Sequence, residues 1–387
     1  MNEFDAVIDF GSNNLRIGVF DSESKSIYSS KVTIHESLNN KDLYNHLNEL
    51  IRDAERHLST HLENVKVLYD TSKFKFIELS IKKSFDQPTS IKKQFENLIE
   101  EANFLIKENH FKYNIIHLII NSLIIDDNKK LKKITDKVKS KSLILELKFI
   151  CLGKSIINNI FSAFKKNSLN ISNIFCSSYV KAIFYNKKLK VKNNLVFLDI
   201  GFERTTAWFF IDNKFVFFNS INLGGNSITK DISNVLDLDI DYSENLKKNI
   251  NIEENVFSNN DQSKNINLYN EIQRKNISID KLKNIIQARV DEIIKLAVYK
   301  NNYFKDTNNL EIQSLIFIGS GSKLLSNNTN FESRKSFQEL IFLKENESTI
   351  CDAGLDYDKS EESQLLFSKK KTKRAGFFER FFNFFSK

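Results

Sequence analysis

Apolar positions along the chain form two similar patterns, one at the start and one after residue 194. In the first pattern, apolar runs at 6–10 and 15–20 predict two strands joined by a short polar turn, and a third strand follows at 27–34. The second pattern repeats this order at 195–200, 205–211 and 214–223. In both patterns the first strand ends in Asp-x-Gly. Because such repetition indicates a duplicated supersecondary unit, the sequence predicts two related α/β domains.

The segments between and after the two patterns predict the remaining elements. Apolar residues at helical spacing favour amphipathic helices at 41–62 and 279–299. Between the two patterns, a strand, a helix and two more strands are expected at 73–85, 90–109, 115–125 and 142–152. These four elements are enough for a small separate α+β unit. Beyond the second pattern we expect a helix from Gly225, a short helix at 241–249, a polar loop region at 251–277 and a strand at 315–318.

The cysteines, the N-terminus and the longest apolar run indicate in which compartment the chain is found. Its three cysteines, Cys151, Cys176 and Cys351, lie far apart without Cys-x-x-Cys spacing, so neither a disulfide framework nor a zinc site is indicated. The acidic N-terminus lacks the basic and apolar regions of a signal peptide. The longest apolar run, at 115–125, is shorter than the ~20 residues that a spanning helix needs. We therefore expect a cytoplasmic chain.

Polar residues at the two predicted hairpins form a candidate triphosphate site. A turn that presents backbone N–H groups and a hydroxyl can bind phosphate oxygens, and an aspartate at the preceding strand end can hold a hydrated Mg²⁺. Asp9 and Asp199 occupy these strand ends and are the predicted metal residues. The other hairpin residues of the candidate site are Gly11, Ser12, Asn13, Asn14, Gly201, Arg204, Thr205 and Thr206. Two glycine turns would bring backbone close to a phosphate, a base or a ribose, at Gly224 with Gly225 and at Gly319 with Gly321.

Several segments resemble the FtsA family of bacterial cell-division proteins, which belongs to the actin-like ATPase superfamily. The resemblance is carried by the second hairpin and by the segments 223–232, 286–294 and 318–322. It implies a two-domain actin-like (ribonuclease H-like) α/β fold with a nucleotide cleft, and ATP with Mg²⁺ as the cofactor. It also implies that the adenosine is contacted by Glu244, Lys247, Ser320 and Ser322.

The same resemblance implies a domain organisation. The first actin-like domain would comprise 1–76 and 153–192, with a small inserted α+β subdomain (SHS2-like) at 77–152 in place of the subdomain found there in actin. The second domain would comprise 193–230 and 308–355, with its own subdomain at 231–307. A polar and basic linker at 356–375 and an amphipathic helix at 376–387 would complete the chain.

The C-terminal segment predicts a membrane anchor. Basic residues cluster in the linker, at Lys369, Lys370, Lys371, Lys373 and Arg374. Six phenylalanines would then occupy one arc of roughly 160° on a helix, at Phe377, Phe378, Phe381, Phe382, Phe384 and Phe385. Such an apolar face beside cations is typical of a helix that lies in the surface of an anionic membrane. FtsA proteins carry their membrane-targeting helix at this place, so the residues and the resemblance agree.

The resemblance also implies partners and a location. FtsZ, other divisome proteins, copies of the chain in actin-like filaments and an anionic membrane surface are the expected partners. The expected location is the cytoplasmic side of the inner membrane at the division septum. The net charge of +8 does not indicate nucleic acid, because the clustered cations lie on the amphipathic tail and no RRM, KH or OB signature is present.

Departures from the family pattern predict weak or absent ATP hydrolysis. The family's glycine-rich second loop ends in aspartate, whereas this chain has Phe202-Glu203-Arg204 there and Ala207 at the end. Asn14 stands in place of a usual lysine, and Ser320 in place of a glycine. Losing charges that neutralise phosphate or orient water typically costs orders of magnitude in rate. No catalytic residue is assigned.

Two other functions of the same superfold stay open. One is a pilus-assembly ATPase of the PilM type, which is not expected to end in this anchor. The other is a sugar or acetate kinase, which needs a carboxylate base that the sequence does not identify. A metal site at His57 and His61 is not favoured, because no third ligand lies nearby in the sequence.

Overall fold

The structure is a computed structural model that describes residues 4–34, 40–131, 137–189, 194–251, 256–257, 272, 274–275, 277–300, 313–325 and 337–367. The predicted membrane-binding residues Lys369 to Phe385 lie outside the described residues. In the part of the chain that is described, no helix is both long and apolar enough to cross a membrane.

The first domain contains a five-stranded sheet in the order β3-β2-β1-β4-β9. β1 (Asp5–Phe10), β2 (Asn14–Phe20) and β3 (Ser26–Thr33) are antiparallel, while β4 (Asn64–Tyr69) and β9 (Asn170–Cys176) continue parallel to β1. Apolar side chains of α1 (Asn40–Leu58) and α3 (Lys154–Lys165) pack on one face of this sheet. Burial of these side chains provides the core of the domain.

The second domain repeats this arrangement in a sheet of order β12-β11-β10-β15-β16. β10 (Leu195–Ile200), β11 (Thr205–Ile211) and β12 (Lys214–Ile221) are antiparallel, and β15 (Ser314–Ile318) and β16 (Glu339–Phe342) are parallel to β10. Its outer face is covered by α5 (Gly225–Leu236), α6 (Ile240–Asn249) and α8 (Ile279–Ile294), which a π-helical turn extends to Tyr299. The equal strand orders and directions are the duplication that the two Asp-x-Gly patterns predict.

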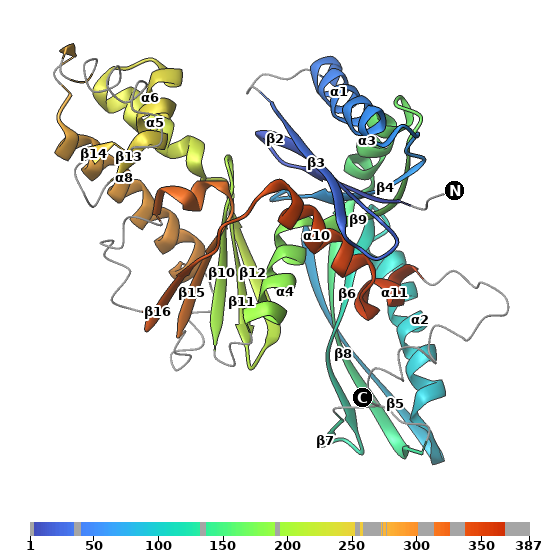
Figure 1. The fold of residues 1–387 in the computed structure, drawn as a ribbon. Helices are drawn as coiled ribbons and strands as arrows, with labels where there is room; N and C mark the ends of the chain where they lie inside the picture. Colours follow the sequence, from blue (N-terminus) through green and yellow to red (C-terminus); the bar gives the residue numbers. More distant parts are fainter. Residues whose placement is uncertain are drawn as a thin grey trace.

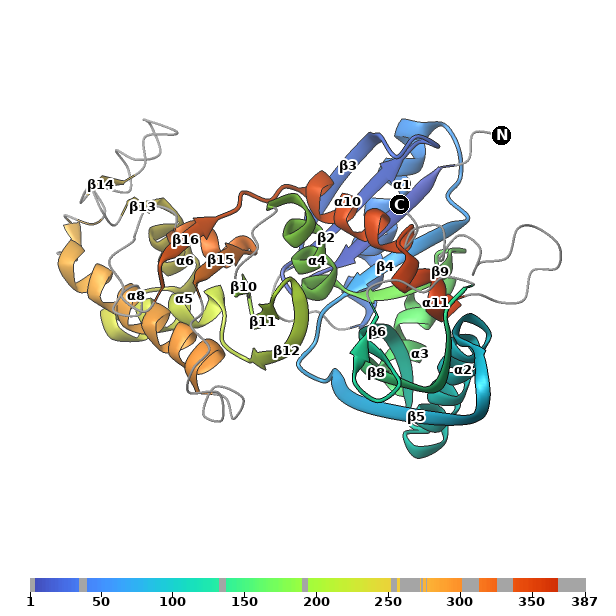
Figure 2. The same cartoon turned by 90° about the horizontal axis from the view of Figure 1, so that it is seen from below.

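Two helices lie between the two sheets and join the domains (Figures 1 and 2). α4 (Ser177–Leu189) and α10 (Glu347–Asp358) share one apolar core with both sheets. That core contains Phe175 of β9 and Trp208 of β11. Because α4 begins directly at the end of β9, its first residues are held at the edge where β1 and β10 end.

The inserted unit extends away from the first domain (Figure 1). It is an antiparallel sheet of order β5-β8-β6-β7, formed by β5 (Lys75–Ser90), β6 (Tyr113–Ile125), β7 (Lys129–Lys130) and β8 (Lys139–Gly153). α2 (Ile91–Asn109) packs on this sheet through a face of buried apolar residues. The predicted strand-helix-strand-strand order is therefore present, with β7 as an additional short strand.

The end of the described chain differs from the predicted boundaries. Residues 347–355 were expected in the second domain, but they belong to α10, which packs against β1, β2 and β3 of the first. Gly18 of β2 allows this approach, because a Cβ there would lie 2.4 Å from the Cβ of Cys351. Part of the predicted linker is also helical, since α10 continues to Asp358 and α11 (Glu361–Phe367) follows.

Candidate nucleotide cleft

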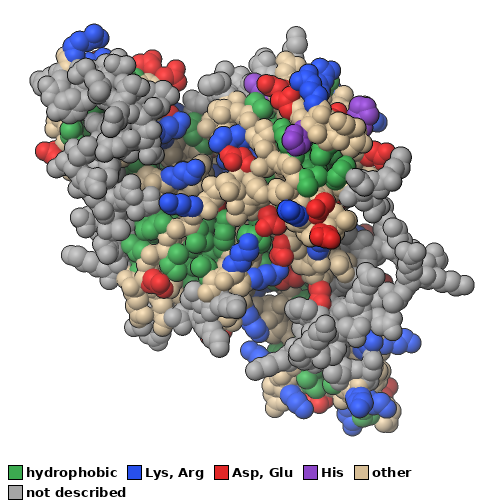
Figure 3. Space-filling model, in the orientation of Figure 1, with side chains coloured by type: hydrophobic (Ala, Val, Ile, Leu, Met, Phe, Trp, Pro, Cys, Tyr) green, Lys and Arg blue, Asp and Glu red, His purple; other side chains and the backbone are tan. Residues whose placement is uncertain are grey.

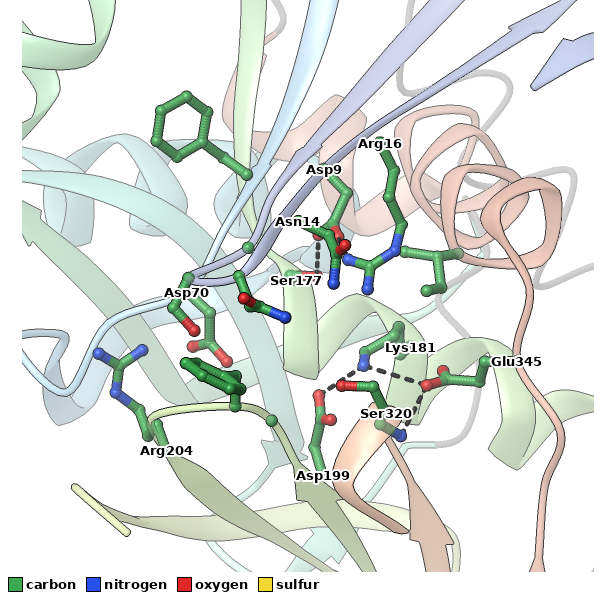
Figure 4. A pocket seen from close by; sticks show the side chains of 18 residues that line it. Asp9, Asn14, Arg16, Asp70, Ser177, Lys181, Asp199, Arg204, Ser320 and Glu345 are labelled. Carbon is green, nitrogen blue, oxygen red and sulfur yellow. Dashed lines mark hydrogen bonds and ion pairs between the residues drawn. The ribbon is translucent and has the colours of Figure 1, made fainter. Parts of the chain in front are cut away.

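The turn between β1 and β2 lines a cleft between the two domains, called here the inner cleft (Figure 4). All five predicted residues of this hairpin line it, namely Asp9, Gly11, Ser12, Asn13 and Asn14. The Gly11 N–H donates to the Asn14 carbonyl at 3.1 Å, which closes the turn. The turn is therefore short enough to place backbone and small polar side chains at its tip.

The turn between β10 and β11 lines the inner cleft from the other domain. Asp199, Gly201 and Arg204 line it as predicted, and Phe202 does so as well. The Gly201 N–H donates to the Arg204 carbonyl at 2.8 Å. The Arg204 Nε is buried and has no hydrogen-bond partner among the described residues. The two equivalent turns of the duplicated units thus meet at one cleft.

Thr205 and Thr206 were predicted in the site, but their hydroxyls are engaged within the second domain. Thr205 Oγ1 donates to the Leu223 carbonyl at 2.7 Å, and Thr206 Oγ1 lies 3.1 Å from Ser220 Oγ. Both side chains are buried, and neither residue is among those that line the inner cleft. These hydroxyls therefore hold β11 to its neighbours within the second domain.

The glycine pair before α5 holds the second hairpin. The Gly225 N–H donates to the Gly201 carbonyl at 2.9 Å, and the Asn226 N–H donates to the Phe202 carbonyl at 2.8 Å. A Cβ on Gly224 would lie 2.5 Å from the Phe202 carbonyl oxygen. The helix start was expected to receive a phosphate, but these N–H groups are already used by the hairpin.

The glycine turn after β15 packs closely against the end of β10. Gly319 has a φ of +87°, and a Cβ there would lie 2.4 Å from Asp199 Oδ1. Gly321 packs against the same strand end. Ser320 lines the inner cleft, while the buried Ser322 donates to the Gly319 carbonyl at 2.7 Å. This turn therefore also fixes the position of Asp199.

Three of the four predicted adenosine residues, Glu244, Lys247 and Ser320, line a second cavity, called here the outer cavity. It has a volume of about 530 Å³, within the range of small-molecule sites, and is lined by Gly225, Glu244, Lys247 and Gly321. Lys247 is buried and donates to the Gly225 carbonyl at 2.9 Å and to the Thr229 hydroxyl at 2.7 Å. The outer cavity shares the tips of both hairpins with the inner cleft. Basic side chains gather on the face where the two domains meet (Figure 3).

Each oxygen of the Asp9 carboxylate accepts a donor from the protein. Arg16 of β2 forms an ion pair with it, with 2.7 Å between Nη1 and Oδ2. The hydroxyl of Ser177 donates to the other carboxylate oxygen at 2.7 Å. Burial would lower the pKa of Arg16, but the attraction of Asp9 outweighs burial and raises it. Asp9 is thus paired with a permanent cation.

Asp199 is paired through one of its carboxylate oxygens with Lys181 of α4 (Figure 4). Lys181 Nζ lies 2.7 Å from Asp199 Oδ2 and 3.5 Å from Glu345 Oε2. Glu345 also accepts the Gly319 N–H at 2.6 Å. Burial would lower the pKa of Lys181, but the charges of Asp199 and Glu345 outweigh burial and raise it.

Asp70 adds a carboxyl to the inner cleft from the end of β4. Burial, with the nearby charge of Asp199 as a second cause, raises its pKa to about 6. The positive charge of Arg204 opposes this shift. Asp70 therefore changes its protonation state close to neutral pH.

The carboxylates present do not fit a hydrated Mg²⁺ between the hairpins. Mg²⁺ is held through free carboxylate oxygens and retained waters. Asp9 and Asp199 instead carry Arg16 and Lys181 at 2.7 Å, and a cation at that distance repels a divalent ion. Among the described residues, no group of three or more His, Cys, Asp or Glu side chains is placed to hold a metal ion.

Four charged residues of the inner cleft were not predicted from the sequence. Arg16 stands directly opposite Asp9 in the first hairpin, so the hairpin register carries a signal for this pair. Lys181 interrupts an otherwise apolar stretch of α4, which is a signal for a buried, paired charge. Asp70 follows a buried strand that is parallel to β1, so its position at the cleft edge follows from the topology. Glu345 has no such local signal.

Comparison with known proteins agrees with the resemblance read from the sequence. Residues 196–345 match the family model described as Cell division protein FtsA. Cell division protein FtsA of Bacillus subtilis (strain 168) is 26% identical over 184 residues. The chain is FtsA-like. The match to the Bacillus protein covers 47% of this FtsA-like chain and 41% of that relative, so less than half of the relative is matched.

Solved structures resemble the chain over most of its length. A PilM-PilN type IV pilus biogenesis complex aligns with a TM-score of 0.58 at 12% identity, over 91% of this chain and 97% of that chain. Ethanolamine utilization protein EutJ from Carboxydothermus hydrogenoformans aligns with a TM-score of 0.48 at 12% identity, over 92% and 89%. The PilM likeness shows the fold alone. The predicted actin-like ATPase fold of this FtsA-like chain is confirmed, and such a fold implies a nucleotide site.

Proposed function

We propose that the chain is an ATP-binding, FtsA-like adaptor that acts in cell division and tethers FtsZ filaments to the cytoplasmic side of the inner membrane. The observation that carries this proposal is the pair of equivalent hairpins that meet at one cleft in an actin-like fold. The match of residues 196–345 to the FtsA family supports it, because this segment includes the second hairpin. The triphosphate would lie in the inner cleft and the adenosine in the outer cavity.

The nucleotide part of the proposal is tested by filling the outer cavity. A Cβ on Gly225 would meet Lys247 Nζ at 3.6 Å, the Gly201 carbonyl oxygen at 3.7 Å and Gly321 Cα at 3.8 Å, which are ordinary contacts. Because Gly225 lines the outer cavity, Gly225→Leu adds bulk to the wall of that cavity. Gly153→Leu is the control, since a Cβ on Gly153 would meet only Ser155 Oγ, at 3.9 Å.

ATP affinity measured by calorimetry should fall at least about tenfold in Gly225→Leu and stay unchanged in Gly153→Leu. Thermal unfolding of both variants should show that they are folded. Equal ATP affinity in the two variants would place the adenosine elsewhere and remove the assignment of the outer cavity.

We propose that hydrolysis is slow, as Ala207 and Asn14 suggest, but Asp70 keeps a phosphoryl-transfer enzyme as the second candidate. Its pKa of about 6 is in the range of a general base that works near neutral pH. Steady-state ATP turnover, alone and with small hydroxyl or carboxyl compounds, separates the two. Turnover above about 1 s⁻¹ that Asp70→Asn abolishes would favour the enzyme.

The membrane part of the proposal depends on the six phenylalanines between Phe377 and Phe385. Replacing Phe381 and Phe382 by glutamate removes two rings that the membrane would bury, each worth about 1.5–3 kcal/mol, so liposome affinity should fall more than a hundredfold. The matched control replaces Phe104 and Phe111, which are 62% and 64% exposed on the body, by glutamate. Sedimentation with anionic liposomes measures both. Unchanged pelleting of the tail variant would contradict the anchor.

The partner is tested with the same liposomes. FtsZ polymers should pellet with vesicles only when the full-length chain is present, and the Phe381→Glu, Phe382→Glu variant should leave them in solution. FtsZ that fails to pellet beside a membrane-bound chain would refute the adaptor function. The structural likeness to PilM does not by itself favour a pilus function, because it shows the fold alone.

A further inference from the structure

A buried lysine occupies the centre of the inner cleft. Lys181 projects from α4 toward the end of β10, and its side chain is 8% exposed. Its ammonium lies 2.7 Å from Asp199 and 3.5 Å from Glu345. A buried ammonium is costly unless paired, and these two carboxylates provide the pairing. Lys181 is therefore a fixed cation beside the carboxylate that the sequence assigned to a metal.

The equivalent carboxylate of the first domain carries a cation too. Arg16 lies 2.7 Å from Asp9, with its side chain 14% exposed. Ser177, one helical turn before Lys181 on α4, donates to the other Asp9 oxygen. Each strand-end aspartate is thus neutralised by the protein, and a divalent ion placed between the hairpins would meet one cation on each side.

The same cations retain donors for a ligand. An ammonium has three N–H donors, and the two carboxylates use two of those of Lys181. The guanidinium of Arg16 has five donors, of which Asp9 accepts one. Arg204 lines the same cleft from the second hairpin, on the side of Asp70 (Figure 4), and its buried Nε has no partner among the described residues. These donors suit phosphate oxygens, for which lysine and arginine are common protein partners.

We propose that Lys181 and Arg16 take the place of the divalent cation, so that the cleft binds a nucleoside polyphosphate through its phosphates without Mg²⁺. This inference rests on the proposed nucleotide site. A divalent ion normally bridges phosphates and neutralises their charge, and here the remaining N–H donors of Lys181 and Arg16 would bind the phosphate oxygens in its place. Metal ions are then unnecessary for affinity, and Asp199 serves to position Lys181.

The test compares ATP binding to the wild-type full-length protein in excess Mg²⁺ and in EDTA, by calorimetry. The inference predicts two affinities within about threefold of each other. ATP binding that requires Mg²⁺ would overturn the inference and leave the proposed nucleotide function intact. Absence of ATP binding in both buffers would overturn both.

Two lysine variants test the role of Lys181 in binding ATP. Lys181→Met keeps the length of the side chain and frees Asp199 and Glu345, so metal-free affinity should fall at least about tenfold and added Mg²⁺ should restore part of it. Lys187→Met is the control, because Lys187 lies on the same helix with its side chain 54% exposed and pairs with Asp356. Equal metal-free affinity in the two variants would overturn the role of Lys181.

A further variant covers the case in which Lys181→Met does not fold. Asp199→Asn removes the carboxylate charge while Lys181 keeps Glu345 as a partner. If Asp199 held a metal, this change would abolish ATP binding. If Lys181 is the binding cation, metal-free ATP affinity should be equal to that of the wild type or higher, and its loss would overturn the inference.

Discussion

His117 should make the protein sensitive to acid, because it is a neutral histidine at a buried junction. It lies on β6 of the inserted unit and is fully buried. The backbone N–H of Cys176 donates to its Nε2 at 2.8 Å, so Nδ1 carries the proton and donates to the Tyr357 hydroxyl at 2.8 Å. Tyr357 and Tyr179 in turn donate to Glu362 of α11 at 3.4 and 3.2 Å.

The size of the effect follows from the pKa of His117, which burial lowers from its ordinary value to about 3. Between pH 6.5 and 3, the unfolded chain therefore binds a proton at this histidine that the folded chain does not. The contribution of His117 to the free energy of unfolding is therefore largest above pH 6.5 and falls as the pH is lowered. At pH 5, about 1.5 pH units below the unfolded pKa, the loss amounts to about 2 kcal/mol at 1.36 kcal/mol per unit.

The assay is urea unfolding at pH 8 and pH 5, followed by fluorescence of Trp208. This residue is the single tryptophan of the chain, and its ring centroid lies 5.1 Å from that of Tyr179, which contacts His117. His117→Gln removes the titrating group, and His61→Gln, at a side chain that is 93% exposed, is the control. Other titrating groups are common to all three proteins and cancel in the comparison.

His117→Gln should lower stability at pH 8 but lose about 2 kcal/mol less than the wild type between pH 8 and pH 5. His61→Gln should follow the wild type. If all three proteins lost the same free energy on acidification, His117 would be protonated without penalty in the folded state, and the hydrogen-bond assignment would be wrong.

Three further predictions concern the two domains. Gly319→Ala should destabilise the protein by about 1–3 kcal/mol in urea unfolding, because of its positive φ and the contact with Asp199, whereas Gly153→Ala should cost under about 1 kcal/mol. Asp70→Asn should be more stable than the wild type at pH 8 and equal to it at pH 4. Because the folded protein raises the pKa of Asp70 to about 6, the wild type loses stability as this carboxyl ionises between about pH 4 and 6, and the asparagine does not ionise. Arg289→Ala, which removes the bidentate, partly exposed pair with Asp231 between α8 and α5, should cost at most about 1 kcal/mol in the same assay.

The sequence predicted the sheets well because their signal is local. Each apolar run of the duplicated units became a strand, and the aspartate at each first strand end lines the cleft. The place of α10 was not predicted, because its packing against β2 joins segments more than 300 residues apart along the chain. Gly18 within an apolar strand was the available hint, since such a glycine often marks a close approach.

The site residues likewise divide into those that a local pattern indicates and those that meet only in the folded chain. Hairpin residues such as Asn13 line the cleft, and the sequence could indicate them because the turn is a local structure. Thr205 and Gly225 have the residue types that phosphate sites use, but the fold uses the hydroxyl of one and the N–H of the other internally. Lys181 and Glu345, 164 residues apart, meet only in the folded chain, so a single sequence contains no pattern that joins them.

Fold and chemistry are therefore determined by different residues in this cleft. The equivalent positions of β1 and β10 in two sheets of equal order put Asp9 and Asp199 at the cleft whatever surrounds them. The duplicated topology does not fix the cations that pair with these aspartates, because Arg16 comes from the hairpin of the first domain and Lys181 from a connecting helix. A match to an actin-like fold thus predicts where the two carboxylates lie but not which cation they hold. The proposed metal-free binding therefore depends on Lys181, a helix residue that the strand ends do not specify, and the comparison of ATP binding with and without Mg²⁺ tests it directly.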